Sequence, residues 1–276
     1  MFNSRLTPVL LIAPAALFVA LAFLLPVLIL LGQSFRNEAG LTLANYGRFF
    51  SDPLSLSVLE RTIRLGLLVT LFAAVIGYAA ALAMADLSSG ARSGMIGVLI
   101  LSLMTSPVAR TYAWVIILGR TGLISSALQF LGLSAEPVRL LFTETAVFLG
   151  LLQLLLPLMI LPLMSALENL PADVIAAART LGAGWRIIFL RVILPLTREG
   201  LVVGGTLVFC GAVTAYITPA VLGGNRVLML ETMLYQRYLA ANDLLTASVI
   251  ACVLIVISVA TNRMLGRLAR GRAASR

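Results

Sequence analysis

The ionisable residues of this 276-residue chain are few and restricted in type. All 20 basic residues are arginine, and the sequence contains no lysine and no histidine. A Walker A loop needs a lysine that reaches the outer phosphates of a nucleotide, so the chain is not expected to hydrolyse ATP itself. Ser-His catalysis, His-ligated zinc hydrolysis and a histidine proton relay are excluded by the same composition. The sequence therefore predicts neither a catalytic centre, nor a metal site, nor a cofactor of its own.

One charged residue and several aromatic residues could act on a solute inside a membrane. Arg110 lies within an apolar run, and an intramembrane charge is a functional candidate by default, although a structural pair with Asp86 or with a carbonyl group would also explain it. A positive charge there suits an anionic or zwitterionic solute, whereas aromatic faces suit an ammonium group. The same aromatic residues could equally pack between helices or anchor the chain at the interface. The candidate residues of a translocation path are Tyr78, Arg110, Tyr112, Trp114 and Tyr216.

A polar connection at residues 168–198 carries the second set of candidates. It is much longer than a tight helical hairpin needs, which predicts structure of its own. Pro171 suits the first turn of a helix, Asp173 complements the positive N-terminal end, and Gly182 or Gly184 suits the C-terminal stop. A narrow stripe of mostly small side chains favours docking into a groove of a partner over lying on lipid. The stripe consists of Val174, Ala177, Ala178 and Leu181.

The elements that position these residues are apolar runs. Hydrophobic residues make up 61% of the chain and charged residues 11%, which places it in a bilayer. Crossing a hydrocarbon core takes about 20 helical residues, and runs of that length recur along the chain. We expect an all-α polytopic membrane protein with six transmembrane helices and a single domain over residues 1–276. The predicted spans are 8–31, 63–85, 95–118, 146–167, 200–218 and 244–261, with 168–198 as a cytoplasmic loop.

Arginine distribution predicts the orientation of the chain. Six spans put both termini on one side, and the positive-inside rule assigns that side to the cytoplasm because it then holds Arg92, the arginines of residues 168–198 and those of the C-terminal tail. Membrane topology therefore explains the net charge of +9 better than nucleic-acid binding does.

Glycines in the fifth predicted span form a small-residue face. This face includes a Gly-x-x-x-Gly spacing, which lets another helix approach closely. The sequence leaves open whether that helix belongs to this chain or to a second subunit. The glycines are Gly200, Gly204, Gly205 and Gly211.

The loop at residues 168–198 resembles the EAA motif of bacterial ABC importer permeases. That motif reads Glu-Ala-Ala, three residues, Gly, nine residues, a branched aliphatic residue, one residue and Leu-Pro. The matching residues are Ala177, Ala178, Gly182, Val192, Leu194 and Pro195. Ala176 stands where the family usually has glutamate, so the resemblance implies docking by shape rather than by a salt bridge at that position. It also implies the type I permease fold, with a coupling helix that moves with a separate ATPase. This role falls on Asp173, Val174, Ala177, Ala178, Leu181, Gly182, Ala183 and Gly184.

Other segments are similar to permeases of the spermidine and putrescine type. The matching segments are Asn45-Tyr46 through Asp52-Pro53, Thr70-Leu71 with Gly77-Tyr78, Arg110 to Trp114 with Gly122 to Ile124, and Thr218 to Gly224. The family usually has proline after the Gly-Tyr pair, where this chain has Ala79. The resemblance implies a small solute that is polyamine-like, or opine-, phosphonate- or amino-acid-like.

The same resemblance implies partners and a location. These are two ATP-binding subunits that hold ATP and magnesium, a second permease subunit that is a paralogue or a second copy, and an external solute-binding protein. The location is the bacterial inner membrane. The alternative is an ion-driven secondary transporter, which ordinarily needs titratable groups at the midplane and often two matching halves; the sequence shows neither.

Overall fold

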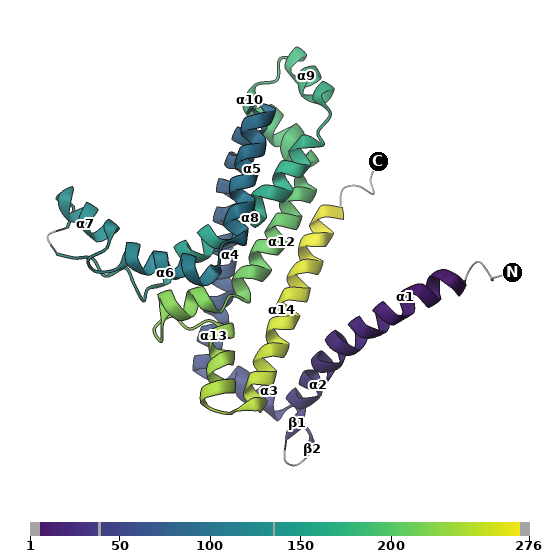
Figure 1. Cartoon of the computed structure of the whole chain (residues 1–276), viewed down its shortest axis with the longest axis vertical. Coiled ribbons are helices and arrows are strands. Elements are labelled where there is room, and N and C mark those ends of the chain that lie inside the picture. Colours follow the sequence, from purple (N-terminus) through teal and green to yellow (C-terminus); the bar gives the residue numbers. More distant parts are fainter. Residues whose placement is uncertain (1–5, 38–39, 135, 271–276) are drawn as a thin grey trace. The chain divides into compact units, whose positions relative to one another are not determined.

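The computed structural model describes residues 6–37, 40–134 and 136–270 (Figure 1). The regular secondary structure of the described residues is helical except for one short antiparallel hairpin, in which β1 (Arg36–Asn37) pairs with β2 (Gly40–Leu41). Internal packing divides the chain into two compact units. Unit 1 contains the chain up to Leu56 together with Met233–Ile255, and unit 2 contains Ser57–Thr232 and the chain from Val256 onward.

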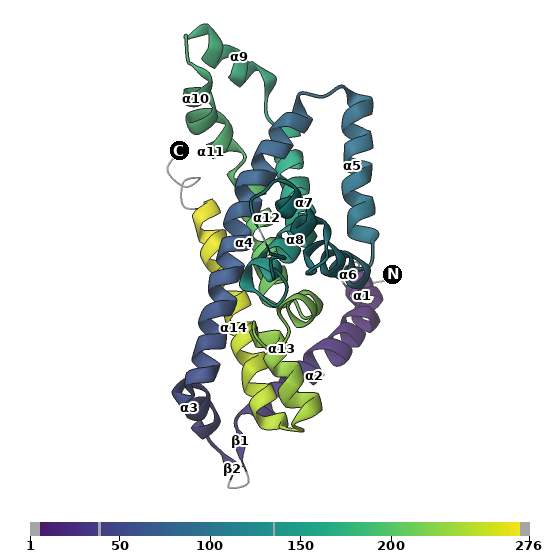
Figure 2. The same ribbon diagram turned by 90° about the vertical axis from the view of Figure 1, so that its left-hand side faces the viewer.

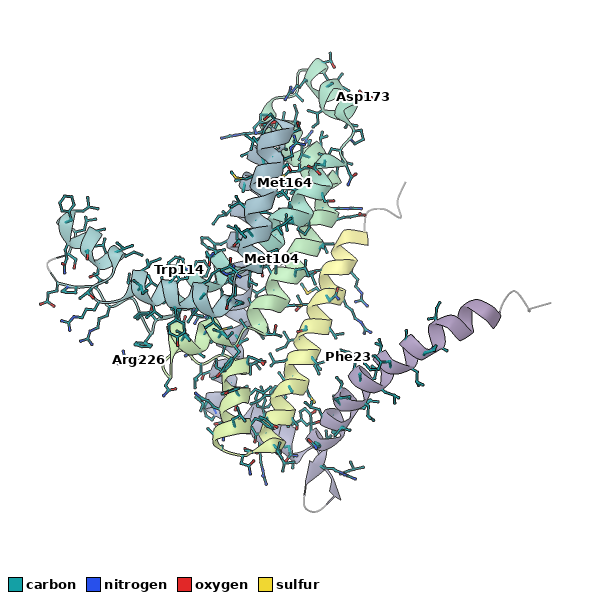
Figure 3. All side chains as sticks on the ribbon, viewed as in Figure 1. Phe23, Met104, Trp114, Met164, Asp173 and Arg226 are labelled. Atoms are coloured by element: carbon teal, nitrogen blue, oxygen red, sulfur yellow. The ribbon has the colours of Figure 1, made fainter. Side chains whose placement is uncertain are left out.

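Unit 1 begins with a long apolar helical stretch. It comprises α1 (Leu6–Val19), the π-helical turn η1 (Ala20–Leu24) and α2 (Leu25–Ser34). The π turn directly precedes Pro26, whose missing N–H leaves a carbonyl of the preceding turn without its helical donor. Phe23, labelled in Figure 3, is 66% exposed, as expected of a side chain that faces lipid. After the hairpin, α3 (Ala44–Ser51) is tied back to α2 because the amide of Asn45 donates to the carbonyl of Ser34.

Unit 2 is built around α8 (Glu144–Glu168), half of whose most apolar stretch is buried. Beside it run α4 (Pro53–Ala85) and α12 (Arg198–Val213), followed in sequence by η3 (Pro219–Gly223). α4 is parallel to α8 because residues near its start contact Glu144, whereas Arg92, which is bonded to the last carbonyls of α4, lies 3.6 Å from Glu168. α12 is antiparallel to α8, since Gly200 faces Pro162 and Gly211 faces Leu155.

The glycine face of α12 packs against α8 of the same chain. A Cβ atom built at Gly200 would lie 2.6 Å from the carbonyl oxygen of Pro162, and one at Gly204 would lie 2.8 Å from Sδ of Met159. These distances leave no room for a methyl group. The structure thus answers the question that the glycine spacing left open: at these two positions the close partner is a helix of this chain.

The remaining elements comprise the long helix α14 and several shorter helices. They are α5 (Ser89–Met104), α6 (Pro107–Leu118), α7 (Leu123–Phe130), α9 (Ala172–Thr180), α10 (Trp185–Ile188), η2 (Phe189–Ile193), α11 (Leu194–Leu196), α13 (Leu230–Tyr235), η4 (Gln236–Ala240) and α14 (Leu244–Arg270). Within unit 2, α9 lies at the end of the helices, beyond α8 and α12, in both ribbon views (Figure 2).

The third predicted span, residues 95–118, is not one helix. α5 ends at Met104 and α6 begins at Pro107, and Figure 1 shows α6 turning away from α5. Proline cannot donate the helical hydrogen bond and drives the residue before it into extended backbone, as Ser106 shows with φ −52° and ψ 126°. The expectation of a continuous helix here was wrong.

The other predicted spans correspond to helices with shifted ends. α4 starts ten residues before the predicted 63, and α12 ends at Val213 rather than at 218. In the part of the chain that the structure describes, five helical stretches are long and apolar enough to cross a membrane: Ile12–Ser34, Pro53–Ala85, Pro107–Phe130, Glu144–Glu168 and Leu244–Arg267. α12, the fifth predicted span, is shorter, with 16 residues.

Candidate coupling loop and translocation path

The helix predicted in the loop is α9. Pro171 is its N-cap, Asp173 lies in its first turn and Arg179 in its last, so both charges complement the helix dipole. The helix stops at Gly182, which has φ +74° and donates from its N–H to the carbonyl of Arg179. The N–H of Ala183 donates to the carbonyl of Ala178, which completes a glycine-centred C-cap. Glycine is required there because a side chain rarely adopts this backbone conformation.

α9 has an inner and an outer side. Ile175 and Ala178 are half-buried and pack against the core of unit 2, whereas Val174, Ala177 and Leu181 are exposed, the last at 87%. Ala178, predicted to share the exposed stripe, thus faces inward in part. Figure 3 shows Asp173 on α9, at an end of unit 2 remote from Arg226. The outer side presents small side chains with nothing from the described chain covering them.

The rest of the loop packs back onto the helix core. Ile188 and Ile193 are buried, and Phe189 places its ring 5.2 Å from that of Tyr78, edge to face. Tyr78, on α4, is buried and shares a hydrogen bond with the hydroxyl of Thr197, which in turn donates to the carbonyl of Ile193. Tyr78, predicted as a path residue, is therefore placed in the core, where it joins α4 to the end of the loop.

The other path candidates lie on α6 and beside η3. Arg110 is in the first turn of α6; its Nη1 is 3.4 Å from Oγ of Ser102, and its buried Nε has no hydrogen-bond partner among the described residues. The suggested pair with Asp86 is not formed, although both residues are described. An arginine with one weak hydroxyl contact at the break of a helix remains a candidate for contact with solute.

The aromatic candidates differ in their surroundings. Tyr112 is 57% exposed, whereas Trp114 points its Nε1 at Oε1 of Gln153 on α8, 3.5 Å away. Tyr216 is half-buried between α12 and η3, and its carbonyl accepts a hydrogen bond from the N–H of Ala220. Arg110, Tyr112 and Trp114 share α6, which is held to η3 by the buried pair Thr111 and Thr218, so α6 and η3 form one packed region.

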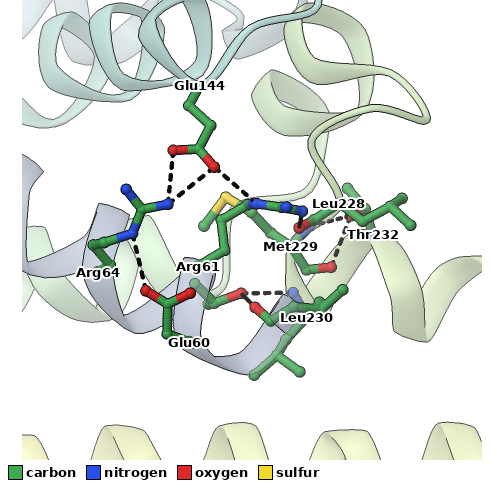
Figure 4. Close-up of polar contacts among 10 residues, drawn as sticks. Glu60, Arg61, Arg64, Glu144, Leu228, Met229, Leu230 and Thr232 are labelled. Carbon is green, nitrogen blue, oxygen red and sulfur yellow. Dashed lines mark hydrogen bonds and ion pairs between the residues drawn. The ribbon is translucent and has the colours of Figure 1, made fainter. Parts of the chain in front are cut away.

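A charged cluster lies at the N-terminal end of α8, opposite to the end that leads into the loop. Figure 4 shows its contacts. Glu144 accepts from Nε of Arg61 at 2.9 Å and from Nη2 of Arg64 at 2.8 Å. Arg61 also donates to the carbonyl of Leu228 at 3.2 Å. The hydroxyl of Thr62 accepts from the N–H of Leu230 at 2.9 Å. The cluster therefore fixes the segment before α13 against α4.

Curated relatives identify the family. The chain is 35% identical over 226 residues to the spermidine/putrescine transport system permease protein PotB of Salmonella typhimurium, covering 79% of this chain and 78% of the relative. It is 32% identical over 258 residues to PotB of Haemophilus influenzae, covering 88% and 90%. This chain belongs to the ABC importer permeases. No protein-family model matches it.

Solved structures show the same fold for this permease. The transporter for the acidic polysaccharide alginate contains a chain that matches it with a TM-score of 0.78 at 16% identity, covering 98% of this chain and 96% of the other. A second structure of an alginate transporter, in complex with an alginate-bound periplasmic protein, also matches at 0.78 with 18% identity. The expected type I permease fold is confirmed, and the comparisons favour the permease over the ion-driven secondary transporter.

Sequence reasoning missed two features of this permease. The first is the pair of Arg61 and Glu144, which are 83 positions apart in the sequence, so no local pattern predicts their contact. Two arginines three residues apart on one helix face did indicate a shared acidic partner. The second feature is Glu231, which is half-buried in the first turn of α13.

Proposed function

We propose that this permease forms half of the transmembrane translocation pathway of an importer for small amine-containing solutes of the polyamine class. The support is its 32–35% identity to permeases named for spermidine and putrescine. Another relative, 30% identical over 54% of this chain, is named as a putative 2-aminoethylphosphonate permease. The proposed solutes therefore include zwitterionic amines.

The proposed assembly contains a second permease subunit, two ATP-binding subunits that hold ATP and magnesium, and an external binding protein that delivers the solute. The structural relative crystallised with a solute-bound periplasmic protein supports the last partner. The multi-pass chain belongs in the bacterial inner membrane, as the name of the relative YdcU indicates for that protein. Both termini are proposed to be cytoplasmic; residues 1–5 and 271–276, with Arg5, Arg272 and Arg276, lie outside the described part.

The observation that carries the coupling role is the two-sided packing of α9. Its outer side, with Asp173, Val174, Ala177 and Leu181, is free to enter a groove of an ATPase, while Ile175 anchors its inner side to the core. Closure of the ATPase pair around ATP would then move α9 as a body, and the glycine C-cap of Gly182–Gly184 would transmit that movement into the rest of the loop.

Movement of the loop has a defined route into the membrane helices. Thr197 ends the loop and is bonded to Tyr78 of α4, so we expect a displacement of the loop to displace α4 as well. We propose that α4 and the broken third span then open the path alternately to either side, with Arg110, Tyr112, Trp114 and Tyr216 near the solute.

The test is solute-stimulated ATP hydrolysis and uptake by the reconstituted complex with its binding protein. Ala177→Asp places a charge on the outer side of α9, where it would have to be buried in the ATPase groove. Ser89→Asp adds the same charge at an exposed position that begins α5, on the same side of the membrane. We expect Ala177→Asp to lose stimulated hydrolysis and uptake, and Ser89→Asp to keep both. Uptake by Ala177→Asp at the level of the unmodified complex would refute the docking role of α9.

A further inference from the structure

Glu231 lies in a tightly packed segment of unit 2. Its neighbours Met229 and Leu230 are fully buried and Thr232 is 3% exposed, whereas Glu231 itself is half-buried. It is therefore the one carboxylate on a short segment whose other side chains are packed into unit 2.

Three contacts fix the backbone of this segment. Arg61 donates to the carbonyl of Leu228, the hydroxyl of Thr62 accepts from the N–H of Leu230, and the hydroxyl of Thr232 accepts from the N–H of Met229 at 2.8 Å (Figure 4). Two of these contacts come from α4 and the third from within the segment. The backbone from which the Glu231 side chain starts is thus held by the scaffold.

The carboxylate of Glu231 has no partner in the described chain. No hydrogen bond or ion pair joins it to another described residue, and burial alone raises the pKa of its carboxyl group. Glu144, by contrast, is bonded to two arginines, Arg61 and Arg64, and these are thereby occupied. Withdrawing a carboxylate from water without a partner is unfavourable, so a half-buried carboxylate of this kind favours a cationic ligand.

We propose that Glu231 binds a protonated amine of the transported solute at the external side of the path. The proposal rests on the function proposed above and assigns a residue to it. An ammonium group carries donors that match the free carboxylate oxygens, and the electrostatic gain is larger at a half-buried carboxylate than at an exposed one. The acid supplies the negative charge that the mid-membrane spans lack, on the external side of Arg110, so a cation meets Glu231 before it meets the arginine.

The experiment uses the whole complex in proteoliposomes with putrescine and spermidine as probes, at saturating loaded binding protein. Glu231→Gln keeps the shape and removes the charge, and Glu231→Asp keeps the charge with a shorter reach. Glu136→Gln is the matched control, because it removes an exposed carboxylate from the connection between α7 and α8. Uptake, basal hydrolysis and subunit stoichiometry are measured for each variant.

We expect Glu231→Gln to lower polyamine uptake by about tenfold or more, the loss of one charge-assisted contact, with basal hydrolysis and stoichiometry unchanged. Glu231→Asp should retain an intermediate rate, and Glu136→Gln the full rate. Three outcomes would overturn the proposal. They are full uptake by Glu231→Gln, loss of the second permease subunit from that variant, which would make Glu231 an interface residue, and import by the unmodified complex of solutes without an amine only. In the last case the proposed amine-solute function falls together with the role of Glu231, whereas full polyamine uptake by Glu231→Gln overturns the role of Glu231 alone.

Discussion

Replacing Gly200 by alanine should destabilise the permease, whereas the same change at Gly205, in the next turn of α12, should not. At Gly200 the new Cβ would lie 2.6 Å from the carbonyl oxygen of Pro162 and 2.7 Å from the Cβ of Ala166. Ordinary contacts between such atoms are about 3.5–4.0 Å, so α8 and α12 would have to separate by about 1 Å. The oxygen belongs to the main chain and cannot rotate away. At Gly205 the nearest atom, Cγ2 of Thr70, is 3.8 Å away, an ordinary contact.

The two variants share one favourable effect and differ in one unfavourable effect. Alanine favours a helix over glycine by about 1 kcal/mol at either site. Overpacking at Gly200 costs about 1–3 kcal/mol, so the free energies of unfolding of the two variants should differ by that amount. For a chain of this size the difference corresponds to about 2–10 °C in the apparent Tm, with Gly205→Ala equal to or above the unmodified protein.

Thermal unfolding of the isolated subunit in detergent measures this difference. Using the isolated subunit matters, because a glycine face that served a second subunit would affect assembly and leave the subunit alone unchanged. Equal Tm values for Gly200→Ala and Gly205→Ala would refute the tight α8–α12 packing.

Two further changes probe the loop. Tyr78→Phe removes the hydroxyl that reaches Thr197, while Thr197 keeps its bond to the carbonyl of Ile193. We expect the variant to lose about 1 kcal/mol of stability in thermal unfolding and to import less solute per ATP hydrolysed. An unchanged ratio of solute imported to ATP hydrolysed would contradict the transmission route. Gly182→Val forces a β-branched residue to φ +74°, which should cost about 1–3 kcal/mol and lower stimulated hydrolysis, whereas Gly182→Asn, which tolerates that conformation, should retain most of it. Equal hydrolysis by both Gly182 variants would show that backbone strain at the C-cap has no role.

The positions of the long helices could be predicted because lipid imposes a simple rule on each of them. Any stretch that crosses the hydrocarbon must satisfy its own backbone and must be apolar for about 20 residues, so hydropathy alone located α8 and α14. Averaging hydropathy over about 20 residues concealed the break between α5 and α6, because the apolar residues on both sides of Pro107 outweigh the polar residues next to it. Proline removes a helical hydrogen-bond donor whatever the mean hydropathy of the residues around it. The residue type therefore indicates the break, and the average hydropathy does not.

The candidate site was predictable where it is local. The end of α9 follows from one glycine, and Asp173 and Arg179 agree with the direction of the helix dipole. The inward orientation of Ala178 and the burial of Tyr78 depend on which helix packs against them, and neither spacing nor composition contains that information. The contact between Arg61 and Glu144 depends on α4 and α8 running parallel, which is a property of the whole fold.

α4 connects the two ends of unit 2 in a way that constrains any transport mechanism. Tyr78 and Thr197 attach it to the loop that carries α9, and Arg61 and Thr62 attach it to the segment that carries Glu231. Between these attachments the helix contains no proline and no glycine at a positive φ, so it can transmit a displacement along its length. We therefore expect a movement of α9 by an ATPase to reach the segment of Glu231 through α4, whereas the break between α5 and α6 interrupts the corresponding route along the third span. The charge proposed to meet the solute would in this way be coupled mechanically to the helix proposed to meet the ATPase.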